Sequence, residues 1–451
     1  MIKKIQASGF PIILTILFII LSLGGYIGMA WWVDRSDYRS FALFLTAVFA
    51  GYAFWWFNRS LFSWRTILIC AVLFRVLFLF DDTTRLSDDV YRFIWDAEQV
   101  SSGVNPYVYT PAEWSAQNPN TIFDASGPLY QHLNSPNYFS VYPPVCQFVW
   151  GLSSWFADIA GVGDSITHRI IFLKSIYLIF EIITMLLLVN ILIKRGMAGQ
   201  LAGIYALNPL IIIELTGNLH PEAIMILFLV LASILALSNR IALAAIPFGF
   251  AVSTKFIPIL FIPFLIKKYG WKNTFIFGSI SLGVAILLFI PFLSPELVTH
   301  VGKSLGLYFT NFEFNASIYF IVRNIFELIT GHNLIEKIGP VLAISAFAAI
   351  IYVFIKQKST ISALLIVYFI YIISATTVHP WYLALPIVLA VYSNDRWPLV
   401  ASGAVMASYF LYSFGFENWW IIAGEYLVII TAFIIDLYRP RQKQPKLSTT
   451  W

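Results

Sequence analysis

Charged residues and cysteines are scarce in this 451-residue chain, and their scarcity excludes several classes of protein. Asp, Glu, Lys and Arg together make up 11% of the sequence, and the net charge is +5. The two cysteines, Cys70 and Cys146, fall in or beside apolar segments, so neither a disulfide framework nor a metal cluster is indicated. No basic face with interleaved aromatic residues exists outside the apolar segments, which argues against a nucleic-acid-binding module.

What the chain has in abundance is apolar sequence, with 59% hydrophobic residues, 17% aromatic residues and a mean hydropathy of +0.79. A soluble protein needs a largely polar exterior and has no place to bury so much apolar surface. Many apolar runs approach the ~20 residues with which a helix crosses the hydrocarbon core, and they are too long for barrel strands. The composition therefore predicts an all-α polytopic membrane protein with about 12 to 14 transmembrane helices.

Clusters of Lys and Arg mark the predicted cytoplasmic loops, because these residues concentrate at the cytoplasmic ends of membrane helices. The clusters are Lys3/Lys4, Arg59/Arg65, Lys194/Arg195, Arg240, Lys267/Lys268/Lys272, Lys356/Lys358, Arg396 and the tail residues Arg439, Arg441, Lys443 and Lys446. Alternation of sides then predicts crossings near 11–32, 41–57, 64–80, 170–193, 200–216, 221–237, 241–253, 255–266, 273–293, 339–356, 360–377, 381–393, 397–414 and 418–437. Two more apolar stretches, 142–158 and 316–330, would put basic loops on the wrong side if they crossed. They are predicted to be re-entrant or surface-lying helices.

We expect a single membrane domain over residues 1–451, with one large external loop at 81–141 that carries short amphipathic helices. The loop opens with a helical pattern from Ser87 to about Ser102 and continues into turn-rich sequence. A smaller external loop is predicted at 294–315. The apolar runs 241–253 and 255–266 are short and meet at polar residues, and such broken helices commonly mark a binding site below the membrane surface.

The segment Leu86–Asp96 concentrates charge beside a predicted membrane helix, with three carboxylates and an arginine in eleven residues. Ser87 is a plausible N-cap, which places Asp88 and Asp89 in the first helical turn, where the helix dipole favours ionised carboxylates. Arg92 is spaced to pair with Asp88, Asp89 and Asp96 on one helix face. A carboxylate held in this way suits a general base, but it suits a cation ligand equally well.

Polar residues that are improbable in apolar sequence fall on the same predicted face as Asp88 and Asp89. Singly, a His before Pro is often a helix cap, a lysine can snorkel to the headgroups, and Trp and Tyr belong to interfacial belts. Together they predict a cavity roofed by the 81–141 loop. The segments concerned are His220-Pro221-Glu222, Ser253-Thr254-Lys255, Asn311–Asn315 and His379-Pro380-Trp381-Tyr382.

The chain also resembles a family of membrane enzymes. The motifs Ser87–Asp96, Gly103–Tyr107 and Val141–Pro144 are similar to the first external loop of GT-C glycosyltransferases, and most similar to bacterial polyprenyl-phosphate-mannose-dependent mannosyltransferases. Four further motifs follow in the family's order within residues 64–390: Asn208-Pro209-Leu210, Gly217-Asn218-Leu219-His220, Thr254–Pro258 and His379–Tyr382. The chain departs from the family at Pro221-Glu222, where relatives often have Asn-Asp.

The resemblance implies that a hexose, mannose in the closest relatives, passes from a polyprenyl-phosphate donor to a glycan or lipid-linked acceptor hydroxyl with inversion. It makes Asp88 the expected base and Asp89 the second candidate. Lys255 and His379, with Arg92 or Arg323, are expected to stabilise the leaving phosphate, and an apolar wall would hold the polyprenyl tail. The full set of expected substrate-binding residues is Arg92, Trp95, Asp96, His220, Glu222, Lys255, Asn315, Arg323, His379, Trp381 and Tyr382.

No metal-ligand spacing stands out, and we expect no cofactor beyond the lipid-phosphate sugar as co-substrate. The expected location is the bacterial plasma membrane, with the active site on the external or periplasmic face. A secondary transporter or lipid flippase is the main alternative, since it shares broken helices and buried ionisable residues. A non-catalytic scaffold subunit is a third.

Overall fold

The computed structural model of the chain describes residues 10–81, 83–357, 361–416 and 418–439. Over these residues the fold consists of helices and loops, with one isolated β-bridge between Phe314 and Thr377. The prediction of an all-α polytopic membrane protein is confirmed. Six of the basic residues used to predict the topology, Lys3, Lys4, Lys358, Arg441, Lys443 and Lys446, lie outside the described residues.

The elements before the middle of the chain are α2 (Phe10–Trp31), α3 (Tyr38–Asn58), η1 (Arg59–Leu61), α4 (Trp64–Leu79), α5 (Asp89–Ser101), α6 (Pro111–Gln117), α7 (Pro128–Gln131), α8 (Pro144–Ile159), α9 (Ile166–Lys194), η2 (Gly199–Ala202), α10 (Gly203–Ala206), α11 (Pro209–Ile211) and the π-helix η3 (Ile212–Gly217). The remainder are α12 (Glu222–Leu237), α13 (Ile241–Val252), η4 (Ile257–Phe261), α14 (Ile262–Phe289), η5 (Ile290–Phe292), α15 (Leu297–Thr310), α16 (Ile318–Thr330), α17 (Ile335–Lys356), α18 (Ile361–Ser374), η6 (Pro380–Leu383), α19 (Ala384–Ala390), α20 (Trp397–Ala404), η7 (Val405–Phe410), α21 (Leu411–Phe414) and α22 (Trp419–Tyr438).

Six helical segments of the described chain are long and apolar enough to cross a membrane, and a seventh is added if one bent pair counts as a single span. The bent pair is Gly199–Ala206 with Pro209–Gly217, which meet at 55°. This number is below the predicted count of about 12 to 14, because several expected crossings are short apolar helices of less than a full span. These are Glu222–Leu237, Ile241–Val252, Ile361–Ser374 and Pro380–Ala390.

Two apolar stretches that were expected not to cross form the amphipathic helices α8 and α16. Helix α8 packs against α5 and α9 and exposes Leu152, Trp155 and Ile159 on its other side. Helix α16 exposes a comparable apolar face. With 16 and 13 residues, both are shorter than a transmembrane helix requires.

A glycine divides the long helix α14 where the sequence predicts a break. Gly270 has φ 77° and ψ 168°, a conformation that side chains other than hydrogen disfavour, and it separates residues 262–269 from 271–289. These two parts correspond to the predicted crossings at 255–266 and 273–293. The predicted loop at 294–315 differs more, because most of it forms the helix α15.

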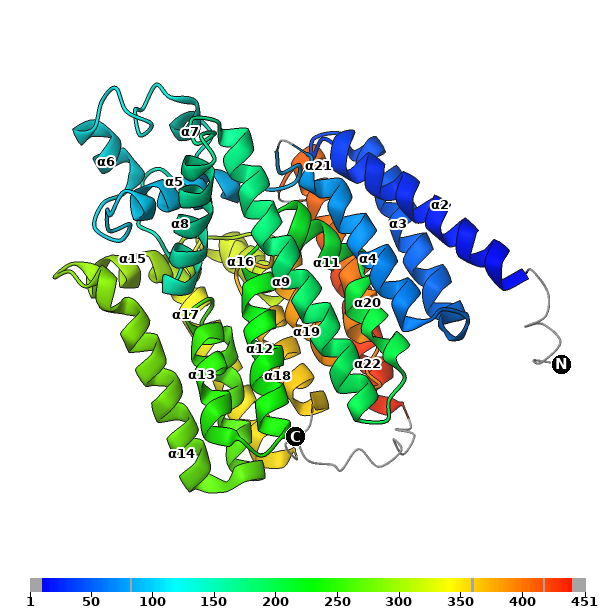
Figure 1. The fold of residues 1–451 in the computed structure, drawn as a ribbon. Coiled ribbons are helices and arrows are strands. Elements are labelled where there is room, and N and C mark those ends of the chain that lie inside the picture. The colour runs from blue at the N-terminus through cyan, green and yellow to red at the C-terminus, as the bar shows by residue number, and fades with distance from the viewer. Residues whose placement is uncertain (1–9, 82, 358–360, 417, 440–451) are drawn as a thin grey trace.

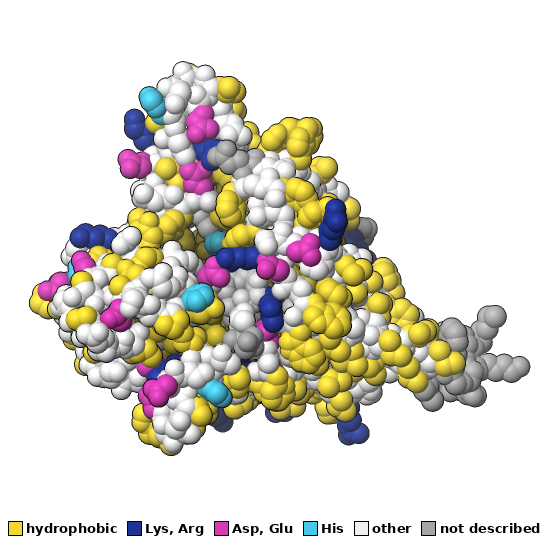
Figure 2. All heavy atoms as spheres, turned by 90° about the horizontal axis from the view of Figure 1, so that it is seen from above, with side chains coloured by type: hydrophobic (Ala, Val, Ile, Leu, Met, Phe, Trp, Pro, Cys, Tyr) yellow, Lys and Arg dark blue, Asp and Glu magenta, His cyan; other side chains and the backbone are white. Residues whose placement is uncertain are grey.

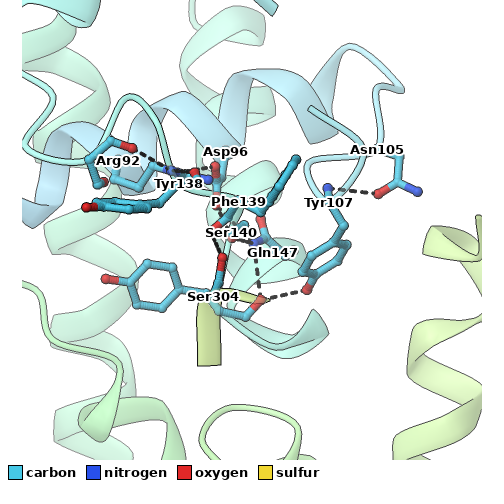
Figure 3. A network of polar contacts seen from close by, with 11 residues as sticks. Arg92, Asp96, Asn105, Tyr107, Tyr138, Phe139, Ser140, Gln147 and Ser304 are labelled. Carbon is cyan, nitrogen blue, oxygen red and sulfur yellow. Dashed lines mark hydrogen bonds and ion pairs between the residues drawn. The ribbon is translucent and has the colours of Figure 1, made fainter. Parts of the chain in front are cut away.

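The 81–141 segment stands at one end of the helical bundle, where α5, α6 and α7 lie close to α8 and α15 (Figure 1). A network of side-chain bonds holds this segment together (Figure 3). Asp96 accepts hydrogen bonds from Arg92, Ser140 and Gln147, while Ser304 on α15 donates to the Phe139 carbonyl over 2.9 Å. Because these bonds join α5, the 138–142 loop, α8 and α15, they fix the roof of the space beneath it.

A buried ion pair holds the broken helices behind this space. Arg75 on α4 and Glu181 on α9 are both fully buried, and their side chains lie 2.9 Å apart. Arg75 also donates to the Ala206 carbonyl at the end of α10 over 2.7 Å. The pair therefore satisfies a carbonyl that the break at 206–209 leaves without a helical partner.

Candidate active site

A cavity of about 1340 Å³ lies beneath the 81–141 segment. Its wall combines this segment with residues after η3, at the start of η4, between α15 and α16, and at the start of η6. Seen from above, charged side chains gather around a hollow at the centre of this face, and apolar side chains cover the flanks (Figure 2). Segments separated by hundreds of residues in sequence thus share one space.

Most of the predicted site residues line this cavity, and four do not. The lining includes Asp88, Asp89, Arg92, His220, Lys255, Arg323, His379, Trp381 and Tyr382. Trp95, Asp96, Glu222 and Asn315 are buried behind the wall. Each of the four contacts other residues of the protein, and none of them is part of the cavity lining.

The neighbouring carboxylates Asp88 and Asp89 have different partners. Asp88 forms an ion pair with Arg35 from the loop between α2 and α3, and Asp89 accepts a hydrogen bond from Asn134 Nδ2 over 2.7 Å. Burial acts to lower the pKa of Arg35, but the hydrogen bond and charge of Asp88 outweigh it and raise that pKa overall. Arg35 is therefore a fixed positive charge beside the carboxylates.

The predicted capping and pairing at this motif need correction. Helix α5 begins at Asp89 with Asp88 as its N-cap residue, and Ser87 Oγ accepts from the Asp89 amide over 3.3 Å. Arg92 pairs with Asp96 alone, because its guanidinium also donates to the Tyr138 carbonyl and so points toward the 135–138 loop (Figure 3). Its predicted pairing with Asp88 and Asp89 is wrong.

Trp95 and Asp96 support this motif from behind. Trp95 is fully buried, with its indole ring edge-on to Phe123 at 4.9 Å between centroids. Asp96 is bonded as described above. Both residues serve the packing of the 81–141 segment, which the sequence could not distinguish from substrate contact.

Four rings form a column on one wall of the cavity. Trp381 lies between His220 and His379, with centroid distances of 3.4 and 4.3 Å and nearly parallel planes. Phe314 extends the column by stacking on His379 at 4.8 Å. The column joins residues from three distant parts of the chain, so a change in any one ring would shift the others.

Lys255 has an anionic partner in Glu222. Its ammonium group forms an ion pair with the buried Glu222 carboxylate and lies 4.6 Å from the centre of the Tyr382 ring. About a quarter of the lysine side chain remains exposed, at 28%, so it can still meet an anion in the cavity. Glu222 stands at the position where the chain departs from the resembled family. Its negative charge offsets the free energy that it costs to place a lysine within a membrane protein.

The 311–333 region contributes a further ion pair to the lining, between Arg323 and Glu313. Arg323 donates to Glu313 over 2.6 Å, and Glu313 also accepts from Asn333. Asn315 instead turns away from the cavity, with a left-handed backbone (φ 47°) and a hydrogen bond of 2.9 Å to Glu425 on α22. Asn315 therefore anchors the loop against α22.

An apolar arm continues from the charged end of the cavity between η4, α15 and α17. Its lining includes Ile257, Leu260, Ala343, Ala346 and Phe347. Phe347 is 59% exposed, so the arm reaches the surface of the bundle. The close approach of α17 to α15 depends on Gly339, where a Cβ would lie 2.0 Å from the Phe309 carbonyl oxygen.

Sequence reasoning missed Arg35, Asn134 and Tyr409, which line the cavity, and Glu214, which lies behind its wall. Glu214 carried a usable signal, because it is a carboxylate inside the apolar run of a predicted crossing. Arg35, Asn134 and Tyr409 carried none, since their contacts depend on tertiary packing. Among the described residues, no group of three or more His, Cys, Asp or Glu side chains is arranged to hold a metal ion.

Comparisons with known proteins place the chain in a family. A sequence model of the family described as "Alpha-(1->6)-mannopyranosyltransferase, N-terminal domain" matches residues 16–269, more than half of the chain. Alpha-(1->6)-mannopyranosyltransferase A of Corynebacterium glutamicum is 26% identical over 184 residues, which is 40% of this chain and 34% of that relative. The chain thus aligns with about a third of the relative's length. These matches confirm the resemblance to bacterial GT-C mannosyltransferases, and the chain belongs to the Alpha-(1->6)-mannopyranosyltransferase family.

Proposed function

We propose that this protein transfers mannose from a polyprenyl-phosphate donor to a hydroxyl of a glycan or lipid-linked acceptor, with inversion at the anomeric carbon. The proposal places the reaction on the external face of a bacterial plasma membrane. The observation that carries it is the continuity of the cavity, whose carboxylate-bearing end runs into an apolar arm that opens on the side of the bundle. A donor with a charged phosphate and a long apolar tail has the same two-part chemistry.

The reaction needs one base on the side of the sugar opposite the leaving group. The acceptor hydroxyl forms the new bond to the anomeric carbon and gives its proton to Asp88, with Asp89 as the second candidate. The bond from that carbon to the phosphate oxygen breaks, and the phosphate keeps the electron pair. A positioned base of this kind contributes about 10²- to 10⁴-fold to the rate.

Charge that develops on the leaving phosphate requires preorganised donors. Lys255 and His379 are the proposed donors, with Arg92 and Arg323 as further cations in the lining. Arg35 joins them, because its pairing with Asp88 leaves other guanidinium nitrogens for a phosphate. Trp381 and Tyr382 would border the sugar or the lipid headgroup.

The family description specifies an α-(1→6) linkage, and an inverting enzyme makes an α-linkage only from a β-linked donor. We therefore propose to reconstitute the purified protein and supply polyprenyl phosphates carrying radiolabelled mannose in either the β or the α configuration. Label transferred from the β donor to an oligomannoside acceptor supports the proposal. A product from the α donor instead would contradict inversion.

The same experiment separates the enzyme from the alternative of a transporter or flippase. A carrier would move the labelled donor across the vesicle membrane without forming a new glycosidic bond. The control is a variant in which Asp88→Asn and Asp89→Asn are combined, which should abolish product. Translocation by both proteins without product would refute the enzyme.

A further inference from the structure

Glu214 is a buried carboxylate that lies behind the cavity wall and has no role in the mechanism above. It sits in the π-helix η3 and is fully buried. In the described part of the chain no lysine or arginine forms an ion pair with it, and the basic side chain in contact with it is His220. An ionisable residue without a fixed counter-ion is expensive inside a membrane and is commonly retained for function.

Three polar side chains converge on this carboxylate. Tyr409 on η7 donates to Oε1 over 2.9 Å, and Asn218 Nδ2 donates to Oε2 over 3.2 Å. His220 Nε2 lies 3.3 Å from Oε2. Tyr409 and His220 both line the cavity, whereas Glu214 does not.

Asn218 extends these contacts to the carboxylate motif. Its side-chain oxygen accepts a hydrogen bond of 3.3 Å from the amide of Leu86, two residues before Asp88. One carboxylate therefore joins the histidine of the aromatic column, a tyrosine of the lining, and the segment that carries the proposed base.

The backbone is shaped to bring His220 back onto Glu214. The Asn218 amide bonds to the Ile213 carbonyl over 2.8 Å, as in a π-helix, and Leu219 adopts a left-handed conformation with φ 64°. The His220 amide then bonds to the Glu214 carbonyl over 3.1 Å. π-helical turns and left-handed non-glycine residues are disfavoured locally, and they persist where the surrounding structure holds them, frequently at functional sites.

We propose that Glu214 is a positioning residue that directs Nε2–H of His220 to its own carboxylate and leaves Nδ1 as the acceptor for a substrate hydroxyl. Nε2 is fully buried and makes no hydrogen bond in the structure, and Oε2 of Glu214, 3.3 Å away, is the acceptor that a small turn of the ring would give it, so Nδ1 is the ring nitrogen that remains for a ligand. The bond made by one ring nitrogen determines which nitrogen carries the proton. The inference rests on the proposed function, because it assigns Nδ1 to a sugar hydroxyl of that reaction.

The tautomer of His220 can be measured without any activity. In protein labelled with ¹⁵N-histidine, the ring ¹⁵N shifts distinguish Nε2–H from Nδ1–H, and a His220→Asn variant assigns the signal among the six histidines of the chain. We expect Nε2–H in the unaltered protein. The isosteric Glu214→Gln variant removes the charge, and its amide N–H can face either Tyr409 or Nε2, so Nε2–H should no longer be the sole tautomer. An Nδ1–H tautomer in the unaltered protein would overturn the proposal even if Glu214→Gln does not fold.

Matched variants separate positioning from general packing. Glu425→Gln changes another buried carboxylate that bonds an asparagine side chain, and it should leave the His220 tautomer as it is. Tyr409→Phe removes one bond to Glu214 without touching His220, and it should also preserve the tautomer. A change in either variant would show that the tautomer follows packing in general and would contradict the assignment to Glu214.

Kinetics then test the link to catalysis. Glu214→Gln should lower kcat by about 10- to 100-fold, as loss of an outer-shell partner does, while KM for the donor changes less than threefold. In a double-mutant cycle with His220→Ala, the second substitution should add little to the first. Fully additive losses would contradict positioning through His220. Absence of transfer by the unaltered protein would refute the proposed function and leave the tautomer measurement standing.

Discussion

Asp88 and Asp89 are adjacent in sequence, and their partners give each a distinct test. Asp88→Asn should keep the fold and donor affinity and lower turnover by about 10²- to 10⁴-fold, because it removes the proposed base. Steady-state kinetics and donor binding measure both quantities. Asp124→Asn is the control, since Asp124 is a carboxylate of the same loop that bonds its own turn and does not line the cavity.

Two outcomes would change this assignment. Near-normal turnover in Asp88→Asn with an inactive Asp89→Asn would move the base by one residue and make Asp88 the partner that holds Arg35. Wild-type turnover in both variants would exclude a carboxylate mechanism at this motif.

Lys255 and Glu222 must be tested together, because they form a partly buried ion pair. Lys255→Met alone leaves an uncompensated carboxylate that is 2% exposed and should cost about 3–5 kcal/mol of stability. The combination of Lys255→Met with Glu222→Gln removes both charges and should recover most of that stability. Turnover should remain low in the double variant, and donor affinity should change less, because the cation acts mainly in the transition state.

Thermal unfolding and kinetics of the three variants decide between a catalytic and a structural lysine. A double variant with wild-type turnover would assign Lys255 to stability alone. The sequence predicted that Lys255 lies at the cavity, but it did not identify Glu222 as its partner, because Glu222 lies 33 residues away. Arg35 shows the same limit, being 53 residues from Asp88.

At the scale of elements, the sequence located segments better than it located their ends and shapes. The helix predicted from Ser87 to about Ser102 is α5, Asp89–Ser101, with its cap one residue later than expected. The apolar run at 200–216 predicted most of η3 as part of a crossing, but a π-helix has no sequence signature of its own. Within it, Glu214 bonds to Asn218 four residues on and to Tyr409 195 residues on, and the second of these contacts is one that no local pattern predicts.

A buried carboxylate between α5 and α9 predicts a pH dependence of stability. Burial raises the pKa of Glu98 to about 7, and the Ser154 and Arg169 side chains offset only part of that effect. The folded state binds the Glu98 proton more tightly than the unfolded state does. The contribution of this proton to stability is therefore fully present below pH 4.5 and is lost as the pH rises toward 7. Melting temperature measured from pH 5 to pH 8 should decrease over this range.

Glu98→Gln is the matched variant, because glutamine keeps the size of the side chain and cannot ionise. Its melting temperature should vary less over the same range, and the difference should correspond to a few kcal/mol at most, at about 1.4 kcal/mol per pKa unit. Parallel curves of melting temperature against pH for the two proteins would show that Glu98 does not titrate in the folded state between pH 5 and pH 8.

At the scale of the whole molecule, composition predicted the fold class, and scattered polar motifs predicted which segments line the cavity. His220, Lys255 and His379 line it together with Asp88 and Asp89, although they come from distant parts of the chain. The number of membrane-spanning helices was not predictable, because hydropathy does not distinguish a full crossing from a short apolar helix such as α13. Likewise, burial placed Trp95 and Asn315 behind the wall, and burial is a tertiary property.

The orientation of the whole bundle in the membrane is the remaining prediction. Proposed external residues on α6 and proposed cytoplasmic residues beside the Gly270 break should differ in access from outside the cell. Gln117→Cys and Lys272→Cys place thiols at exposed positions in these regions, and the native Cys70 and Cys146 are buried. In intact cells an impermeant thiol reagent should label Gln117→Cys and label Lys272→Cys only after permeabilisation.

The parent protein, treated in parallel, gives the background from the native thiols. The reverse pattern would put the cavity mouth on the cytoplasmic side, so a donor would have to arrive from that leaflet. Labelling of both positions in intact cells would contradict the alternation of basic loops on which the topology rests.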